Sequence, residues 1–134
     1  MGDRIEAVAS PAKYFFDTYA IIEIAEGNPR YEQYREIDFA TARLNIVEFH
    51  YRMLRYFNEQ TAEASIEKMW NNAVEFDKDT MVEANKFRLK NKSKKLSTTD
   101  CIGYIYALKH GMLFLTGDKE FEGLPHVEFV KKQS

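Results

Sequence analysis

The chain has 134 residues, of which 45% are hydrophobic and 30% are charged, and 19 basic and 21 acidic residues give a formal net charge of −2. This length and apolar content predict one folded domain and exclude a disordered chain. No apolar run approaches the roughly 20 residues that a membrane span needs, and residues 1–12 lack the pattern of a signal peptide. The single cysteine, Cys101, excludes an internal disulfide and a cysteine-based zinc site.

These features predict a soluble cytoplasmic protein with no membrane association. We expect residues 1–12 to form a poorly ordered lead-in, residues 13–130 to form a single domain, and residues 131–134 to form a charged tail. The charge is not evenly spread, because residues 84–95 hold six basic and no acidic side chains, leaving 13 basic against 21 acidic residues elsewhere. This basic stretch is either a local attractant for a polyanion or a solvated helix face followed by a loop.

In chain order, the pattern of the first half predicts a strand over 14–16, a helix over 18–25, a short helix over 31–35, a strand over 37–39 and a helix over 41–57. Thr18 and Thr41 are the expected capping residues of the two longer helices. The inward stripe of the helix over 41–57 is expected to comprise Leu44, Val47, Tyr51 and Leu54.

The second half predicts a helix over 61–71, a strand over 74–76, a helix opened by Asp77 that runs to Leu89, a helix opened by Ser97 and stopped by Gly111, and strands over 112–115 and 127–130. Trp70 is expected to be a core residue. Short apolar strands that alternate with amphipathic helices are typical of parallel sheets covered on both faces. The predicted fold is therefore α/β, a three-layer α/β/α sandwich with a central parallel sheet.

Four acidic residues are expected at one end of this sheet. Asp17 and Asp118 follow predicted strands, where ligands of parallel sheets bind, and Asp100 lies in the first turn of its helix. Glu48 is expected near the core boundary of its helix, and not in open water. Taken singly, each acid could be a turn, capping or surface residue. Together they would repel one another, which favours a divalent cation, and oxygen ligands without thiols suit Mg²⁺ or Mn²⁺.

Other motifs are weaker. His50, His110 and His126 match no zinc-protease or triad spacing, and His110 suits the end of a helix. The chain has no GxGxxG and no GxxxxGK[ST], so dinucleotide or nucleoside triphosphate binding has no support.

Four segments carry a resemblance to a known family: YFFDTYAIIEI, TARLNIVEFHYRM, LSTTDCIGYIYALKHG and MLFLTGDKEFEGLPHVEFV. They resemble the successive acidic motifs of PIN domains, with VapC-type toxin ribonucleases as the most similar group, over residues 13–130. The resemblance implies Mg²⁺- or Mn²⁺-dependent hydrolysis of RNA. It places metal-binding and catalytic acids at Asp17, Glu48, Asp100 and Asp118, and supporting hydroxyls at Thr18 and Thr116.

The resemblance also implies a homodimer and an antitoxin that silences the site. Candidate dimer contacts lie in aromatic-rich helices, at Tyr31, Tyr34, Tyr51, Tyr56 and Phe57. Basic side chains shortly before Asp100 are expected to hold the RNA backbone, at Lys90, Lys92, Lys94 and Lys95.

Two alternatives stay open. One is a PIN-domain nuclease of RNA processing or decay that has no antitoxin. The other is a non-catalytic α/β interaction module, such as a receiver-like signalling domain. The absence of a second acid beside Asp17 disfavours a receiver.

Overall fold

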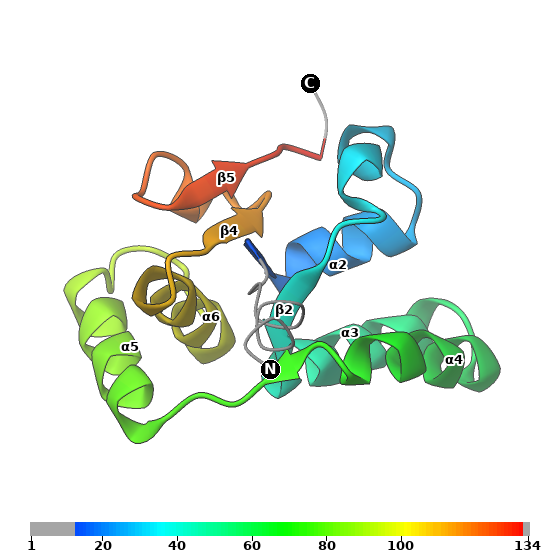
Figure 1. Ribbon diagram of the computed structural model, residues 1–134, viewed down its shortest axis with the longest axis horizontal. Coiled ribbons are helices and arrows are strands. Elements are labelled where there is room, and N and C mark those ends of the chain that lie inside the picture. Colours follow the sequence, from blue (N-terminus) through cyan, green and yellow to red (C-terminus); the bar gives the residue numbers. More distant parts are fainter. Residues whose placement is uncertain (1–12, 133–134) are drawn as a thin grey trace, which may run out of the picture.

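A computed structural model describes residues 13–132, and these form a five-stranded sheet between two layers of helices (Figure 1). In chain order the elements are β1 (Tyr14–Phe16), α2 (Thr18–Ala25), the 3-10 helix η1 (Pro29–Tyr34), β2 (Phe39–Ala42), α3 (Arg43–Tyr56), α4 (Glu59–Trp70), β3 (Ala73–Val74), α5 (Lys78–Lys90), α6 (Thr98–Lys109), β4 (Leu113–Thr116), the 3-10 helix η2 (Lys119–Phe121) and β5 (Val127–Phe129). The lead-in expected over residues 1–12 lies outside the described residues.

All strand pairs of the sheet are parallel, and the strand order is β3-β2-β1-β4-β5. Helices α5 and α6 cover one face, and α2, α3 and α4 cover the other (Figure 1). The predicted three-layer α/β/α fold with a parallel sheet is therefore confirmed. Within residues 13–132, no helix is long and apolar enough to cross a bilayer.

Neighbouring residues on the central strands alternate between two separate cores. Phe15 and Phe114 pack with α5 and α6, while Phe16 and Leu115 pack with the helices of the opposite layer. Both faces of β1 and β4 are therefore dry, which explains why these strands are uninterrupted apolar runs in the sequence. Successive side chains of a strand point to opposite faces, so each short strand contributes to both cores.

Helix α6 approaches β1 closely because position 103 has no side chain. A Cβ atom at Gly103 would lie 2.7 Å from Cε1 of the Phe15 ring. That contact is shorter than atoms tolerate, so a larger residue would push the helix away from the sheet. Gly103 lies one turn beyond Asp100, and the close approach therefore brings the start of α6 to the edge of the sheet.

Several predicted boundaries are shifted by one or two residues. Asp17, not Thr18, caps α2, and its side chain accepts a hydrogen bond from the Thr18 N–H. Thr41 belongs to β2 and does not open α3, because its backbone pairs with β3 and its hydroxyl donates to the Phe16 carbonyl. The strands predicted over 37–39 and 74–76 are observed at Phe39–Ala42 and Ala73–Val74.

The predicted inward stripe of α3 is wrong. Its four residues (Leu44, Val47, Tyr51 and Leu54) lie on the exposed face, with Val47 62% and Tyr51 63% exposed. The buried residues of α3 are Asn45, Ile46, Phe49 and Met53. A second helical stripe, displaced by one position and containing a polar residue, therefore faces the core.

Three aromatic residues are also placed differently from the prediction. Trp70 is 51% exposed, and the Arg43 guanidinium lies 5.2 Å from its ring centre, so it is not a core residue. Tyr31 and Tyr34 are buried among the helices of the α2–α4 layer and are not free to contact a partner. Tyr51, Tyr56 and Phe57 remain exposed.

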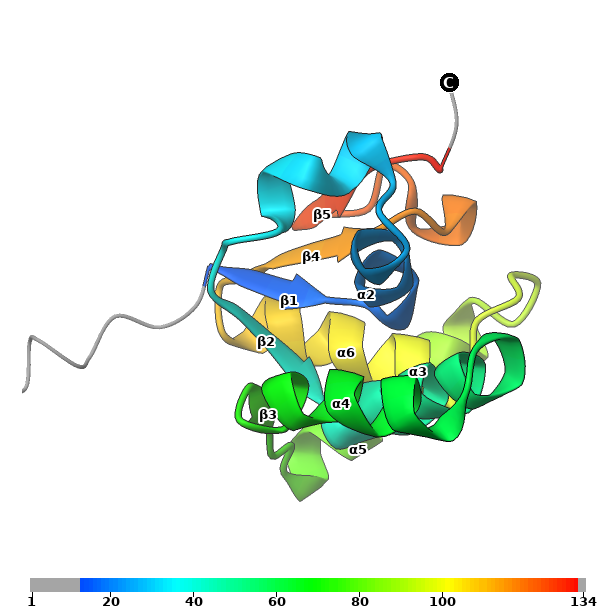
Figure 2. The ribbon, with the colours of Figure 1, turned by 90° about the vertical axis from the view of Figure 1, so that its right-hand side faces the viewer.

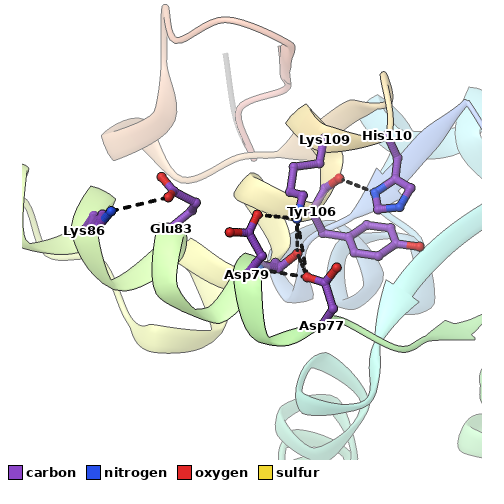
Figure 3. A network of polar contacts seen from close by, with 8 residues as sticks. Asp77, Asp79, Glu83, Lys86, Tyr106, Lys109 and His110 are labelled. Atoms are coloured by element: carbon purple, nitrogen blue, oxygen red, sulfur yellow. Dashed lines mark hydrogen bonds and ion pairs between the residues drawn. The ribbon is translucent and has the colours of Figure 1, made fainter.

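A polar network ties α5 to α6 at the end of the molecule away from Asp100 (Figure 3). Lys109 donates to Asp77 over 3.3 Å, to Asp79 over 2.9 Å and to the Thr80 hydroxyl over 3.1 Å. Asp77 also caps α5 as predicted, and hydrogen bonds from Thr80 lower the pKa of Asp77 to about 2. His110 follows the helix, and its ring stacks on Tyr106. The hydrogen bonds of Lys109 thus join the end of α6 to the start of α5.

Candidate active site

The carboxyl ends of β1 and β4 lie side by side in the sheet (Figure 2). Asp17 directly follows β1 and Thr116 ends β4, and both are buried, with Asp17 2% exposed. The Asp17 N–H donates to the Leu115 carbonyl, so the pairing of β1 with β4 sets the position of this acid.

Asp17 is held by two hydrogen bonds. One carboxylate oxygen accepts from the Thr116 hydroxyl over 2.7 Å, and the other accepts from the Thr18 N–H over 2.9 Å. Burial raises the pKa of Asp17 to about 8, and the nearby charge of Asp100 adds to the rise, although the two hydrogen bonds oppose it. A buried carboxyl that resists ionisation next to another acid is typical of a functional site.

Asp118 and Asp100 are fixed by their own local turns. The Asp118 N–H donates to the Thr116 hydroxyl over 3.1 Å, and its side chain accepts from the Glu120 N–H. Asp100 accepts from the Ser97 N–H over 2.9 Å in a capping box at the start of α6. Burial raises the pKa of Asp100, with a smaller rise from the charge of Asp118.

Glu48 reaches the same region from α3, although its side chain is exposed and not at the core boundary as predicted. The Thr18 hydroxyl donates to Glu48 over 2.7 Å. The charge of Glu48 also contributes to the raised pKa of Asp100. The four predicted acids therefore interact with one another, from β1, α3, α6 and the turn after β4.

Asn45 belongs to this region and was missed by sequence reasoning. Its side chain is fully buried and donates to the Thr18 hydroxyl over 2.9 Å. An Asn at the start of a helix usually indicates a capping residue, so the residue type alone did not point to a functional site. Its position could have done so, because Asn45 lies one turn before Glu48 on the same helix.

The chemistry of these side chains suits a hard divalent cation, since all four are carboxylates and the neighbouring groups are hydroxyls. Within residues 13–132, however, no three Asp, Glu, His or Cys side chains converge closely enough to hold a metal ion as they stand. Mutual repulsion keeps free carboxylates apart.

A basic hollow of about 680 Å³ lies beside this site, between α5 and the loop before α6. Lys92, Lys94 and Lys95 line it together with Arg88. Lys94 is partly fixed, because its ammonium group donates to the Glu120 carbonyl over 2.9 Å, close to Asp118. Three of the predicted lysines therefore line one hollow, and Ser97, which also lines it, is hydrogen-bonded to Asp100.

The fourth predicted lysine, Lys90, lies apart from the other three and lines a different depression, next to Glu83 and Lys86. Arg88, which the prediction did not include, anchors the basic loop. Its guanidinium donates to the Leu96 carbonyl over 3.0 Å and to the Thr98 hydroxyl over 2.8 Å.

Comparison with solved structures shows the same fold in several proteins. A toxin–antitoxin complex from Klebsiella pneumoniae has a chain 23% identical to this one, with a TM-score of 0.68 over 86% of this chain and 95% of that chain. The DNA-bound VapBC complex from Salmonella typhimurium gives 16% identity and a TM-score of 0.69 over 91% and 99%. VapC20 from Mycobacterium tuberculosis, a toxin that cleaves the sarcin–ricin loop, gives 16% and 0.65 over 86% and 98%.

No curated protein sequence matches the chain significantly. The family model described as PIN domain matches residues 14–127, which include β1, β4 and all four acids. This match confirms the resemblance found in the sequence and disfavours the receiver-like alternative. The chain belongs to the PIN domain family.

Proposed function

We propose that this protein is a Mg²⁺- or Mn²⁺-dependent endoribonuclease and the toxin of a toxin–antitoxin pair. The observation that carries the proposal is the buried Asp17 beside Asp100, at the edge of the sheet where Asp118 and Glu48 also lie. Membership of the PIN family and similarity to VapC toxins support it.

In this proposal Asp17, Glu48 and Asp100 are the main metal ligands, and Asp118 is an outer or second-metal ligand. When bound, the cation supplies Lewis-acid activation of water and of the scissile phosphate. Thr116 holds Asp17 and the backbone of Asp118 in one orientation through its single hydroxyl.

The basic hollow supplies the RNA contacts of the proposed enzyme. Lys92 and Lys95 are exposed beside the start of α6, which bears Asp100, so they can neutralise backbone phosphates next to the acidic site. The Lys94 ammonium group already donates to the Glu120 carbonyl, so we expect it to contribute less to RNA binding than Lys92 and Lys95. The contribution of Lys90 is expected to be the smallest of the four, because it lies outside the hollow.

The test is cleavage of a labelled RNA by purified protein with Mn²⁺, Mg²⁺, Ca²⁺ or EDTA. Cleavage should require Mn²⁺ or Mg²⁺, and Ca²⁺ should inhibit because its longer bonds and looser shell misplace the reacting oxygens. Asp100→Asn and Glu48→Gln should abolish cleavage without unfolding the protein, whereas Glu63→Gln, on the exposed part of α4, should retain it. Robust cleavage in EDTA would overturn the proposal.

An antitoxin partner is the part of the proposal that distinguishes a toxin from a nuclease of RNA processing or decay. Support comes from the similar chains of the Klebsiella and Salmonella complexes, which were solved as toxin–antitoxin or VapBC assemblies. A short open reading frame upstream, encoding a DNA-binding protein, should suppress the nuclease when both are expressed together. If coexpression of no neighbouring gene suppresses the nuclease, the processing or decay nuclease is the better assignment.

A homodimer is the expected assembly, and the exposed apolar stripe of α3 is its candidate contact surface. Val47 and Tyr51 are the most exposed members of this stripe. Light scattering at micromolar concentration should give about twice the 15.7 kDa mass of one chain. Val47→Glu should reduce that mass, while Met81→Glu, on the exposed face of α5, should leave it unchanged.

A further inference from the structure

The Asn45 side chain makes two hydrogen bonds, one through each end of its amide. Its carbonyl oxygen accepts from the Ala42 N–H over 3.1 Å, and its amide nitrogen donates to the Thr18 hydroxyl over 2.9 Å. The Ala42 N–H is only a donor, so the oxygen of the amide must face it. The orientation of the Asn45 amide is therefore fixed by the backbone.

This orientation determines where the Thr18 proton goes. A hydroxyl has one proton, and when it accepts from Asn45 it cannot point that proton back at the same amide. The Thr18 hydroxyl donates to Glu48 over 2.7 Å. The chain of bonds therefore runs in one direction, from the backbone at the start of α3 through Asn45 and Thr18 to the carboxylate of Glu48.

We propose that Asn45 is a positioning residue for the metal site: it fixes the Thr18 hydroxyl as a donor that holds one oxygen of Glu48, leaving the other oxygen for the cation. This inference rests on the proposed function. Glu48 is exposed and lies on a long side chain, so without this bond it would sample several rotamers. Helix capping alone would require only the Asn45 oxygen, whereas the buried amide nitrogen serves only Thr18.

The experiment measures Mn²⁺ affinity by calorimetry in Asn45→Ala, Thr18→Val and the double variant. Each single change should weaken Mn²⁺ binding about tenfold, the size expected for a hydrogen bond to a charged group. The double variant should also lose about tenfold and not a hundredfold, because both changes break one chain of bonds. Thr18→Ser is the matched control, since it keeps the hydroxyl and should bind within about threefold of the wild type.

A structural role for Asn45 would give a different result. Urea unfolding in EDTA would then show a loss of stability in Asn45→Ala, while its Mn²⁺ affinity would stay within twofold of the wild type. That outcome, or losses that multiply in the double variant, would overturn the inference.

Wild-type protein provides a second measurement that does not depend on the folding of any variant. In ¹⁵N spectra, titration with Mg²⁺ should shift the side-chain amide resonances of Asn45 with the Kd that calorimetry gives for Mg²⁺ binding to the wild type. If the Asn45 resonances do not shift in a protein that binds Mg²⁺ and cleaves RNA, the inference about Asn45 is refuted and the proposed function stands. A wild-type protein that neither binds the metal nor cleaves RNA would refute the proposed function as well.

Discussion

Replacing Asp17 by Asn should stabilise the metal-free protein, because the buried carboxyl opposes folding at neutral pH. Its pKa is 3.8 as an ordinary aspartate and about 8 in the folded protein. A group whose folded pKa is raised binds more protons in the folded state, so stability falls as pH rises from 3.8 toward 8. Below pH 3.8 the carboxyl is protonated in both states and has no effect.

The magnitude follows from the size of that shift. At about 1.4 kcal/mol per pH unit, the proton that Asp17 keeps in the folded protein at pH 7, and loses in the unfolded chain, costs about 4 kcal/mol of folding free energy. An Asn side chain avoids this cost but cannot accept from both the Thr18 N–H and the Thr116 hydroxyl, and the lost hydrogen bond costs about 1 kcal/mol. Asp17→Asn should therefore raise the free energy of unfolding by about 3 kcal/mol at pH 7.

Urea unfolding in EDTA, followed by circular dichroism between pH 5 and 8, measures this effect. The wild type should lose about 1.4 kcal/mol per pH unit relative to Asp17→Asn between pH 5 and 7, and less as the pH approaches 8, and Mn²⁺ should stabilise only the wild type. Glu63→Gln, which removes an exposed acid of α4, is the control and should follow the wild type. Parallel pH profiles for the wild type and Asp17→Asn would refute the claim that Asp17 is destabilised by burial.

Two further predictions concern basic residues. Lys109→Met should lower the urea midpoint by breaking the network in Figure 3, and the loss should shrink at high salt. Asp77 belongs to the same network, and hydrogen bonds from Thr80 lower its pKa to about 2. Its stabilisation of the folded protein is therefore present above pH 3.8 and is lost as the pH falls through about 2. Changing Lys92 and Lys95 together to Gln should flatten the salt dependence of log K for uncleavable single-stranded RNA by about 1.4, at roughly 0.7 per contact.

Each of these changes has a matched control in the chain. Lys86→Met removes an exposed lysine that pairs with Glu83 on the same helix, and should leave the urea midpoint nearly unchanged. Lys68→Gln with Lys78→Gln removes the same charge from α4 and from the far end of α5, and should preserve the salt slope. Equal slopes for both lysine pairs would mean that the hollow does not contact RNA.

Sequence patterns predicted the elements around the site well. The strand over 14–16 and the helix cap at Ser97 are local features, since each depends on a few adjacent residues. Asp17 and Asp118 followed from the same logic, because the carboxyl ends of parallel strands meet at one edge. The order of strands brings β1 and β4 together, as the prediction needs.

The face of α3 could not be predicted from periodicity. Two stripes of this helix have helical spacing, and the more apolar one is exposed, while the buried one begins with Asn45. Asn45 is buried because the Ala42 N–H and the Thr18 hydroxyl satisfy its amide, and one of these partners lies 27 residues away. A pattern within one helix has no information about a partner on another element.

The two separate cores on either side of the sheet have a consequence for how the protein can be inactivated. Glu48 comes from the layer that packs on Phe16, Asp100 comes from the layer that packs on Phe15, and Asp17 comes from the sheet between them. A displacement of one helix layer relative to the other would change the distances between these acids, even if both cores stayed buried. Activity can therefore be lost while the protein is still folded. Substitutions that leave a cavity deep in either layer should lower activity although they lie far from the acids.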